Sequence, residues 1–262
     1  LIPLVLGYFK DRWVFGKEAK RLAVVGEDCT ETDLYGKAKR REKVILAGKT
    51  YDAVWLLAKY ISLTLQDFEN IQYLTFTTPE TDVDMAKMLK GIGQHIGVDK
   101  EIISVQDYKE SFCQYMIFQP KELWQYESAL FYCDEDRIKA YMLRRLRVDA
   151  SHGMNSFVTV DEVANAQRKE LEALYPIMNK EKSPDVLCNG RRAFMGNNLY
   201  SKGACYKSIR KCESNDDGPI YLDETKLTER ICLRMRVDGQ EGWYPLVTWG
   251  THWYEADGQW EV

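Results

Sequence analysis

The chain has 262 residues, 45% of them hydrophobic and 29% charged, and its 36 Lys and Arg against 40 Asp and Glu give a formal net charge of -4. This composition excludes wholesale disorder and fibrous repeats, and the charge argues against a dedicated nucleic-acid-binding protein. No apolar run reaches the roughly 18 residues that a membrane-spanning helix needs, so we expect a soluble protein without a membrane partner. Seven cysteines without a Cys-x-x-Cys pair argue against a zinc site or disulfide framework, and favour the cytoplasm.

The first predicted element is a hairpin, in which the apolar run 1–9 pairs with a strand at 13–15 across a turn. Gly16 then begins a short helix. The polar stretch 26–41 is predicted to be an exposed loop, and residues 44–46 a further short strand. The first residue is not Met and already lies in a predicted strand. We therefore expect that an N-terminal piece has been removed or that the sequence is part of a longer chain.

Helices and strands alternate in the next segment. Apolar residues at helical or alternating spacing predict helices over 51–68, 81–96 and 107–118, and strands over 71–77 and 101–105. Asp52 lies near the start of the first helix, and Thr81 can cap the second. Gly97 ends the second helix, as glycine often does.

The next predicted elements are a hairpin of strands 129–133 and 137–143 around the acidic turn Asp134-Glu135-Asp136, a long helix over 158–178, a strand over 183–187 and a helix over 199–209. Asp161 and Glu162 favour the long helix, because carboxylates suit the positive N-terminal end of a helix dipole. After a turn-rich linker at 214–219, residues 231–237 alternate with period two, and Asp238-Gly239 is a strong hairpin signal. Further strands are predicted over 242–249 and 251–255.

Four segments of the chain resemble a known superfamily. They are Trp13-Val14-Phe15-Gly16-Lys17-Glu18-Ala19-Lys20, residues 71–80, residues 102–115 and residues 196–206. In order, they resemble the chaperones' vGeeAk helix entry, their aVITVPA strand, the strand that leads into the first inter-domain helix, and the late avAkGAA helix. The chain thus resembles the actin, heat-shock-chaperone and sugar-kinase ATPase superfamily over roughly residues 1–210. It is closest to a bacterial family of that superfamily whose members carry a similar KGAcY stretch and an aromatic β tail, and whose activity is uncharacterised.

The resemblance implies an α/β fold with two actin-ATPase-like, ribonuclease-H-like lobes, which in that superfamily clamp ATP between them. The lobes would span residues 1–115 and 116–213, and a small antiparallel β unit would span 214–262.

The phosphate loops that the resemblance implies are degenerate. The first glycine-rich hairpin would precede Leu1, and the second reads Asp134-Glu135-Asp136 where the chaperones have glycines. Three carboxylates within ~4 Å of a triphosphate would cost several kcal/mol. The adenosine loop should follow Val186, but the chain passes almost directly to Cys188, so a segment outside this sequence is plausible there. We therefore expect no ATP or Mg²⁺ binding and no other cofactor.

The best anion-site candidates are Arg191, Arg192, Asn197, Asn198, Lys202 and Gly203. Arginine forks suit phosphate or carboxylate, and Gly203 together with Gly196 permits close backbone approach. The alternative, which the sequence favours, is a solvated turn whose asparagines cap or adopt left-handed conformations.

Other candidate groups are weaker. The acidic tip at 134–136, like Asp216 and Asp217, could bind Ca²⁺ but matches a solvated turn better. The three histidines, His95, His152 and His252, lack partners at metal spacing, so we expect no metal site. The basic patch Arg144, Arg145 and Arg147 is expected to face water or to pair with acidic neighbours.

These observations favour a non-catalytic scaffold or protein-interaction protein on an actin/chaperone-like fold, with the β tail as a recognition module. Four tryptophans of the tail, Trp243, Trp249, Trp253 and Trp260, either fill the core of the β unit, which the sequence favours, or form a binding face. The alternative function is an ATPase or small-molecule kinase whose phosphate loops lie outside this sequence. The third functional hypothesis is a hydrolase that uses Cys113 or Ser111. It is ranked last because neither residue lies in a nucleophile motif.

Overall fold

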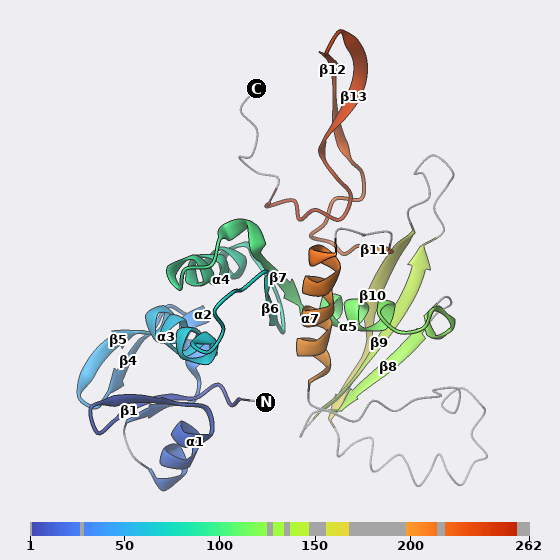
Figure 1. Ribbon diagram of the computed structural model, residues 1–262. Coiled ribbons are helices and arrows are strands. Elements are labelled where there is room, and N and C mark those ends of the chain that lie inside the picture. Colours follow the sequence, from blue (N-terminus) through green and yellow to red (C-terminus); the bar gives the residue numbers. More distant parts are fainter. Residues whose placement is uncertain are drawn as a thin grey trace, which may run out of the picture. The chain divides into compact units, whose positions relative to one another are not determined.

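The computed structural model describes residues 2–26, 29–124, 128–133, 137–146, 156–167, 198–213 and 218–255. The chain divides into two compact units, Leu1–Asp107 and Tyr108–Val262. Small sheets alternate with six α-helices in the described residues, so the fold is mixed α/β (Figure 1). The predicted lobe boundaries after residues 115 and 213 stay predictions.

The first unit begins with the predicted hairpin, which the structure confirms. Strand β1 (Leu6–Phe9) pairs antiparallel with β2 (Arg12–Phe15). Lys10 and Asp11 turn the chain with φ of 49° and 61°. Two successive positive φ values are those of a type I′ turn, whose twist matches that of a two-residue hairpin. Helix α1 (Gly16–Val25) follows, as predicted.

The stretch 26–41 is not an exposed loop, so this prediction was wrong. It contains strand β3 (Thr30–Glu31), which pairs with β1, and helix α2 (Leu34–Lys39). Leu34 and Ala38 are fully buried. They are four residues apart, so they share one face of the helix, and two apolar side chains suffice to bury that face in an otherwise polar segment.

Strands β4 (Lys43–Leu46) and β5 (Lys49–Asp52) form a second hairpin that leads into α3 (Ala53–Leu65). The Asp52 carboxylate accepts hydrogen bonds from the backbone N–H groups of Val54 (2.8 Å) and Trp55 (3.1 Å), and so caps the helix. The predicted helix over 51–68 is therefore confirmed in its centre and shorter at both ends.

The rest of the first unit is a strand–helix–strand crossover. Strand β6 (Leu74–Thr78) runs parallel to β7 (Ile103–Asp107), and helix α4 (Val83–His95) and the 3₁₀ turn η1 (Lys100–Ile102) lie between them in the chain. The cap of α4 is Asp82, whose carboxylate accepts the N–H of Met85 at 2.7 Å, and not the predicted Thr81. Gly97 ends this segment with φ of 91°, which suits a residue without a Cβ.

The second unit is built on a four-stranded sheet in the order β11-β10-β9-β8. Its elements are α5 (Tyr108–Ile117), the 3₁₀ turn η2 (Lys121–Leu123), β8 (Ser128–Cys133), β9 (Arg137–Leu146), β10 (Phe157–Gln167), α7 (Leu199–Cys212) and β11 (Ile220–Tyr221). The predicted β8–β9 hairpin and the helices at α5 and α7 are confirmed. The acidic turn at 134–136 lies outside the described residues.

The predicted helix over 158–178 is wrong where the structure describes it. Residues 157–167 form β10, which pairs antiparallel with the whole of β9. Asp161, read as a helix-dipole partner, instead pairs across the sheet with Arg144 at 2.8 Å. A long-range ladder thus overrode a local helical pattern in a segment that also contains β-branched residues. Residues 168–178 and the predicted strand 183–187 lie outside the described residues.

Helices α5 and α7 pack together against the sheet of the second unit (Figure 1). The buried cluster there contains Phe112, Tyr141, Val158 and Tyr200, among others. Gly203 of α7 meets α5 at the tightest point: a Cβ on Gly203 would overlap the backbone carbonyl of Ser111. The glycine therefore sets how closely the two helices approach.

The C-terminal segment forms the predicted hairpin of β12 (Ile231–Val237) and β13 (Gln240–Val247). Asp238 (φ 51°) and Gly239 (φ 81°) make its turn. The strand predicted over 251–255 is absent; one isolated bridge pairs His252 with Lys226, and a turn follows.

Candidate functional site

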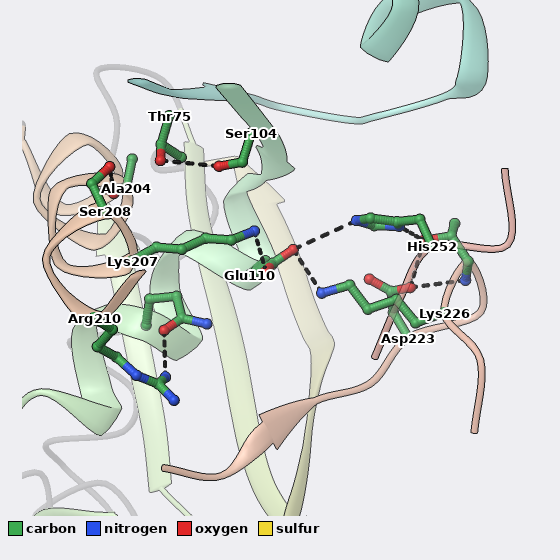
Figure 2. A network of polar contacts seen from close by, with 12 residues as sticks. Thr75, Ser104, Glu110, Ala204, Lys207, Ser208, Arg210, Asp223, Lys226 and His252 are labelled. Atoms are coloured by element: carbon green, nitrogen blue, oxygen red, sulfur yellow. Dashed lines mark hydrogen bonds and ion pairs between the residues drawn. The ribbon is translucent and has the colours of Figure 1, made fainter. Parts of the chain in front are cut away.

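A buried charge cluster surrounds Glu110 on α5 (Figure 2). The Glu110 carboxylate accepts a hydrogen bond from Lys207 Nζ of α7 at 2.7 Å. Its second oxygen lies 2.8 Å from Lys226 Nζ and 4.0 Å from His252 Nε2. The Glu110 side chain is 4% exposed and that of Lys226 is 5% exposed. One carboxylate thus joins α5, α7 and the C-terminal segment.

A second set of polar contacts holds the histidine. The carboxylate of Asp223 accepts hydrogen bonds from the hydroxyl (2.7 Å) and the backbone N–H (2.8 Å) of Thr225. The Thr225 hydroxyl lies 2.8 Å from His252 Nδ1. Because the only hydroxyl proton goes to Asp223, Nδ1 of His252 carries the proton that Thr225 accepts. This leaves Nε2 unprotonated in the neutral ring, on the side of Glu110.

The charges of the cluster follow from burial and proximity. Burial alone would raise the pKa of Glu110, but the charges of Lys207, Lys226 and His252, with the Lys207 hydrogen bond, hold its pKa well below the usual range. Burial, and next the charge of Lys226, lower the pKa of His252 to about 4. At neutral pH the cluster therefore contains one carboxylate, two ammonium groups and an uncharged imidazole.

This geometry supports attachment more than catalysis. A general acid or base has to reach a substrate, and the four side chains of the cluster, Glu110 included, are at most 14% exposed. What the arrangement does is fix α7 and the segment around Lys226 and His252 onto α5. A buried carboxylate with two lysine partners specifies one arrangement, because any other leaves a charge without a counter-ion.

The β12–β13 hairpin differs from this buried cluster because much of its surface is exposed. Apolar side chains lie exposed on it: Trp243 is 70% exposed, Ile231 49%, Met235 40% and Leu233 38%. Directly opposed residues share a face, so Leu233 lies beside Tyr244, and Trp243 lies beside Arg234. Both faces of this two-stranded ribbon therefore carry apolar surface, and its sheet has no third strand in the described part of the chain.

The base of the hairpin is attached to the sheet of the second unit. The Trp249 ring meets Phe157 of β10 edge to face, with centroids 6.1 Å apart, and the Arg230 guanidinium lies 5.0 Å from the Trp249 centroid. The core role that the sequence favours for the tail tryptophans is therefore wrong for Trp243 and Trp253, which are exposed. A ribbon of two strands has no second layer to cover its faces. Trp260 lies outside the described residues.

Three of the predicted anion-site residues are described by the structure, and each has different surroundings. Gly203 is a helix-packing residue that faces Ser111, and Lys202 is exposed on α7. Asn198 occupies the N-cap position of α7 without a side-chain cap. Arg191, Arg192 and Asn197 lie outside the described residues, so the anion site stays a prediction.

Other sequence candidates are placed as follows. Cys113 and Ser111 are fully buried in the core of the second unit, where no substrate reaches them without opening the core. Arg144 pairs with Asp161, as expected for a basic residue with acidic neighbours. His95 ends α4. Outside the described residues lie His152, Arg147, Asp216 and Asp217. In the described ranges no three His, Cys, Asp or Glu side chains come together as a metal site would need.

Comparison with family models covers nearly the whole chain. Residues 1–185 and 177–224 match the Family of unknown function (DUF5716) C-terminal. The chain belongs to this family. Residues 226–262 match a second model, the Domain of unknown function (DUF8552). No curated protein matches the sequence. None of the helices in the described part of the chain combines the length and hydropathy needed to cross a membrane.

The Glu110 cluster joins the two matched regions. Glu110 and Lys207 lie in the part that matches the DUF5716 family, whereas Lys226 and His252 lie in the part that matches the DUF8552 model. The exposed hairpin belongs wholly to the second part. The buried ion pairs thus anchor the segment that carries the apolar ribbon.

Lowering the pH from 7 to 5 should destabilise the fold through His252. Its pKa is 6.5 when unfolded and about 4 when folded, so the unfolded chain binds more protons in this window. Stability is therefore lost as the pH falls, by about 2 kcal/mol between pH 7 and 5. Urea unfolding at both pH values measures this, and His252→Gln should remove most of the difference. An unchanged difference in the variant would assign it to other groups.

Proposed function

We propose that this protein is a non-catalytic scaffold that binds a protein partner through the β12–β13 hairpin. The observation that carries the proposal is the apolar surface on the hairpin, headed by Trp243 at 70% exposure. Contiguous apolar patches, and exposed tryptophan in particular, are typical of protein–protein interaction sites. A ribbon with both faces uncovered is also marginal by itself, so a partner that covers one face would stabilise it.

The chemistry of the two faces indicates what such a partner offers. On one face Leu233 and Met235 lie with Tyr244, and Gly242 opposite Met235 leaves that methionine uncovered. On the other face Trp243 lies beside Arg234, which forms an exposed ion pair with Glu241 at 3.2 Å. The first face suits an apolar protein surface, and the charged second face suits the polar rim of an interface.

The scaffold itself is proposed to be actin/chaperone-like, with two ribonuclease-H-like lobes. Supporting this, the resembling segments 71–80, 102–115 and 196–206 contain β6, the β7–α5 connection and most of α7. Two of these segments supply the helices that pack at Gly203. The order of elements and this contact support a common ancestry of the fold; they carry no activity with them.

Replacing Leu233 and Trp243 by serine should abolish partner binding without unfolding the protein. Both side chains are exposed, so their loss removes binding surface but little packing. Affinity purification from the native lysate, quantified by mass spectrometry, should show partner recovery reduced roughly tenfold or more. Val24→Ser, at an exposed apolar residue of α1, is the matched control and should bind as the parent does. Equal recovery with the double variant would contradict the proposal.

Deleting residues 218–262 is a poorer test of the same idea. That deletion removes Lys226 and His252 from the buried Glu110 and so breaks up the charge cluster. It also removes β11 from the edge of β10. Lost binding could then follow from lost folding, whereas the serine variants keep these contacts.

Titration of the complete natural chain with Mg-ATP should give no binding heat. The acidic residues at 134–136 stand where the superfamily places glycines, and carboxylates repel a triphosphate. Isothermal titration calorimetry measures this directly. Micromolar affinity would instead favour the alternative, an ATPase or small-molecule kinase whose other phosphate loops lie outside this sequence.

A further inference from the structure

A groove of about 480 Å³ lies between α3 and α4 in the first unit. Its size is that of small-molecule binding sites. Its lining includes the apolar side chain of Trp55, the charged side chains of Arg41, Asp52 and Lys87, and Gly91. Neither the β12–β13 hairpin, proposed above to bind a partner, nor the Glu110 cluster takes part in this groove.

Trp55 gives the groove a flat and firmly held apolar surface. Its indole is 41% exposed. The ring stacks on Tyr51, with centroids 5.6 Å apart and planes 12° from parallel, and Trp13 contacts it at 5.7 Å. An indole fixed by two aromatic neighbours loses little conformational entropy when a planar ligand packs on it.

The polar side of the groove is positively charged. Arg41 and Lys87 form no ion pair with any residue in the described part of the chain. The one lining carboxylate, Asp52, already accepts the N–H groups of Val54 and Trp55. An anion in the groove therefore meets two cations and no competing anion that is free of other contacts.

Arg41 also occupies a costly backbone position. It follows the end of α2 with φ of 57°, a left-handed conformation in which glycine is favoured. An arginine there keeps a cation at the groove at the expense of local backbone strain, which is typical of positions with a binding role.

Gly91 keeps the groove open. It lies within α4, is exposed, and a Cβ built on it would meet no atom within 4 Å. Glycine in a helix interior is unfavourable relative to alanine, and no packing contact requires it here. Any larger side chain at this position would extend into the space that a ligand needs.

We propose that this groove binds a small aromatic carboxylate, with the ring on Trp55 and the carboxylate between Arg41 and Lys87. A flat apolar body satisfies the indole surface, and a carboxylate suits the planar fork of an arginine. The size of the groove and its position within one unit fit a small molecule. The site is independent of the hairpin, so either proposal can fail alone.

The test compares naphthalene-2-carboxylate with its uncharged carboxamide, titrated into the full chain and followed by calorimetry. The carboxylate should bind roughly tenfold more tightly than the amide. Arg41→Gln combined with Lys87→Gln should bring the two affinities within about threefold of each other. Gly91→Phe should weaken both probes roughly tenfold or more.

Two further variants make the outcome decisive. Gly91→Leu repeats the block with a better helix former, so a folding defect in Gly91→Phe does not leave the proposal untested. The hairpin variant with serine at positions 233 and 243 should keep full probe affinity, because the hairpin takes no part in the site. Equal affinity for carboxylate and amide, no binding of either probe, or unchanged binding in folded Gly91→Phe and Gly91→Leu would each overturn the proposal.

Discussion

Gly203→Ala should lower the free energy of unfolding by about 3 kcal/mol or more. The added Cβ would overlap the backbone carbonyl of Ser111, and backbone atoms cannot rotate out of the way as a side chain can. Relief requires α5 and α7 to separate, which opens the buried cluster around Phe112 and Tyr200. Urea unfolding followed by circular dichroism measures the loss.

The matched control is Gly91→Ala, which makes the same chemical change in another helix interior. No atom lies within 4 Å of its new Cβ, so only helix propensity acts, and stability should rise by about 0.5–1 kcal/mol. The two substitutions should thus have opposite signs. If Gly203→Ala also stabilised the protein, α5 and α7 would not pack as closely as the structure shows.

Glu110→Gln should cost about 3–5 kcal/mol. The substitution keeps the shape of the side chain but leaves the ammonium groups of Lys226 and Lys207 without their counter-ion. Lys226 is 5% exposed, so water screens its charge little. The loss should appear as a lower midpoint in urea at pH 7, where the native Glu110 is fully charged because its pKa is well below the usual range.

Glu241→Gln provides the comparison for an exposed pair. Arg234 and Glu241 are 67% and 62% exposed, so breaking this pair should change stability by less than about 0.5 kcal/mol. A small effect at both glutamates would mean that Lys207 and Lys226 reach water when Glu110 is neutral, and would contradict the role of the buried cluster as an anchor.

The elements predicted correctly are those with local causes. The β1–β2 and β12–β13 turns are each made by two consecutive residues. Helices α3 and α4 follow from apolar residues at helical spacing, and α3 also from its cap at Asp52. Such signals act within one or two turns of the chain, so they survive whatever packs around them.

The elements predicted wrongly depend on distant partners. Residues 158–178 have the apolar spacing and acidic start of a helix, but β9 offers residues 157–167 a ladder that is ten residues long. The polar composition of residues 26–41 predicts a loop, but Leu34 and Ala38 are buried in the core of the first unit. In both cases the contact that decides the structure involves residues outside the short sequence window in which periodicity is read.

The candidate site was only partly visible in the sequence. Glu110 could have been noticed as a single carboxylate on a helix whose neighbours Phe112, Cys113 and Met116 are apolar, since a buried charge needs a partner. Nothing local identified those partners, because Lys207 and His252 lie 97 and 142 positions further along the chain. The tail tryptophans were visible, but their exposure was not.

The sequence alone determined the mixed α/β class, the tight turns, the Asp52 cap of α3 and an ordinary composition without a membrane-spanning run. Tertiary structure decided that residues 157–167 are a strand, that Gly203 is a helix contact and that Glu110 is the centre of an ion-pair cluster. The physical reason is the separation along the chain over which each interaction acts. Backbone conformational preferences and caps act between near neighbours, whereas strand pairing, burial and charge neutralisation depend on which distant segments meet.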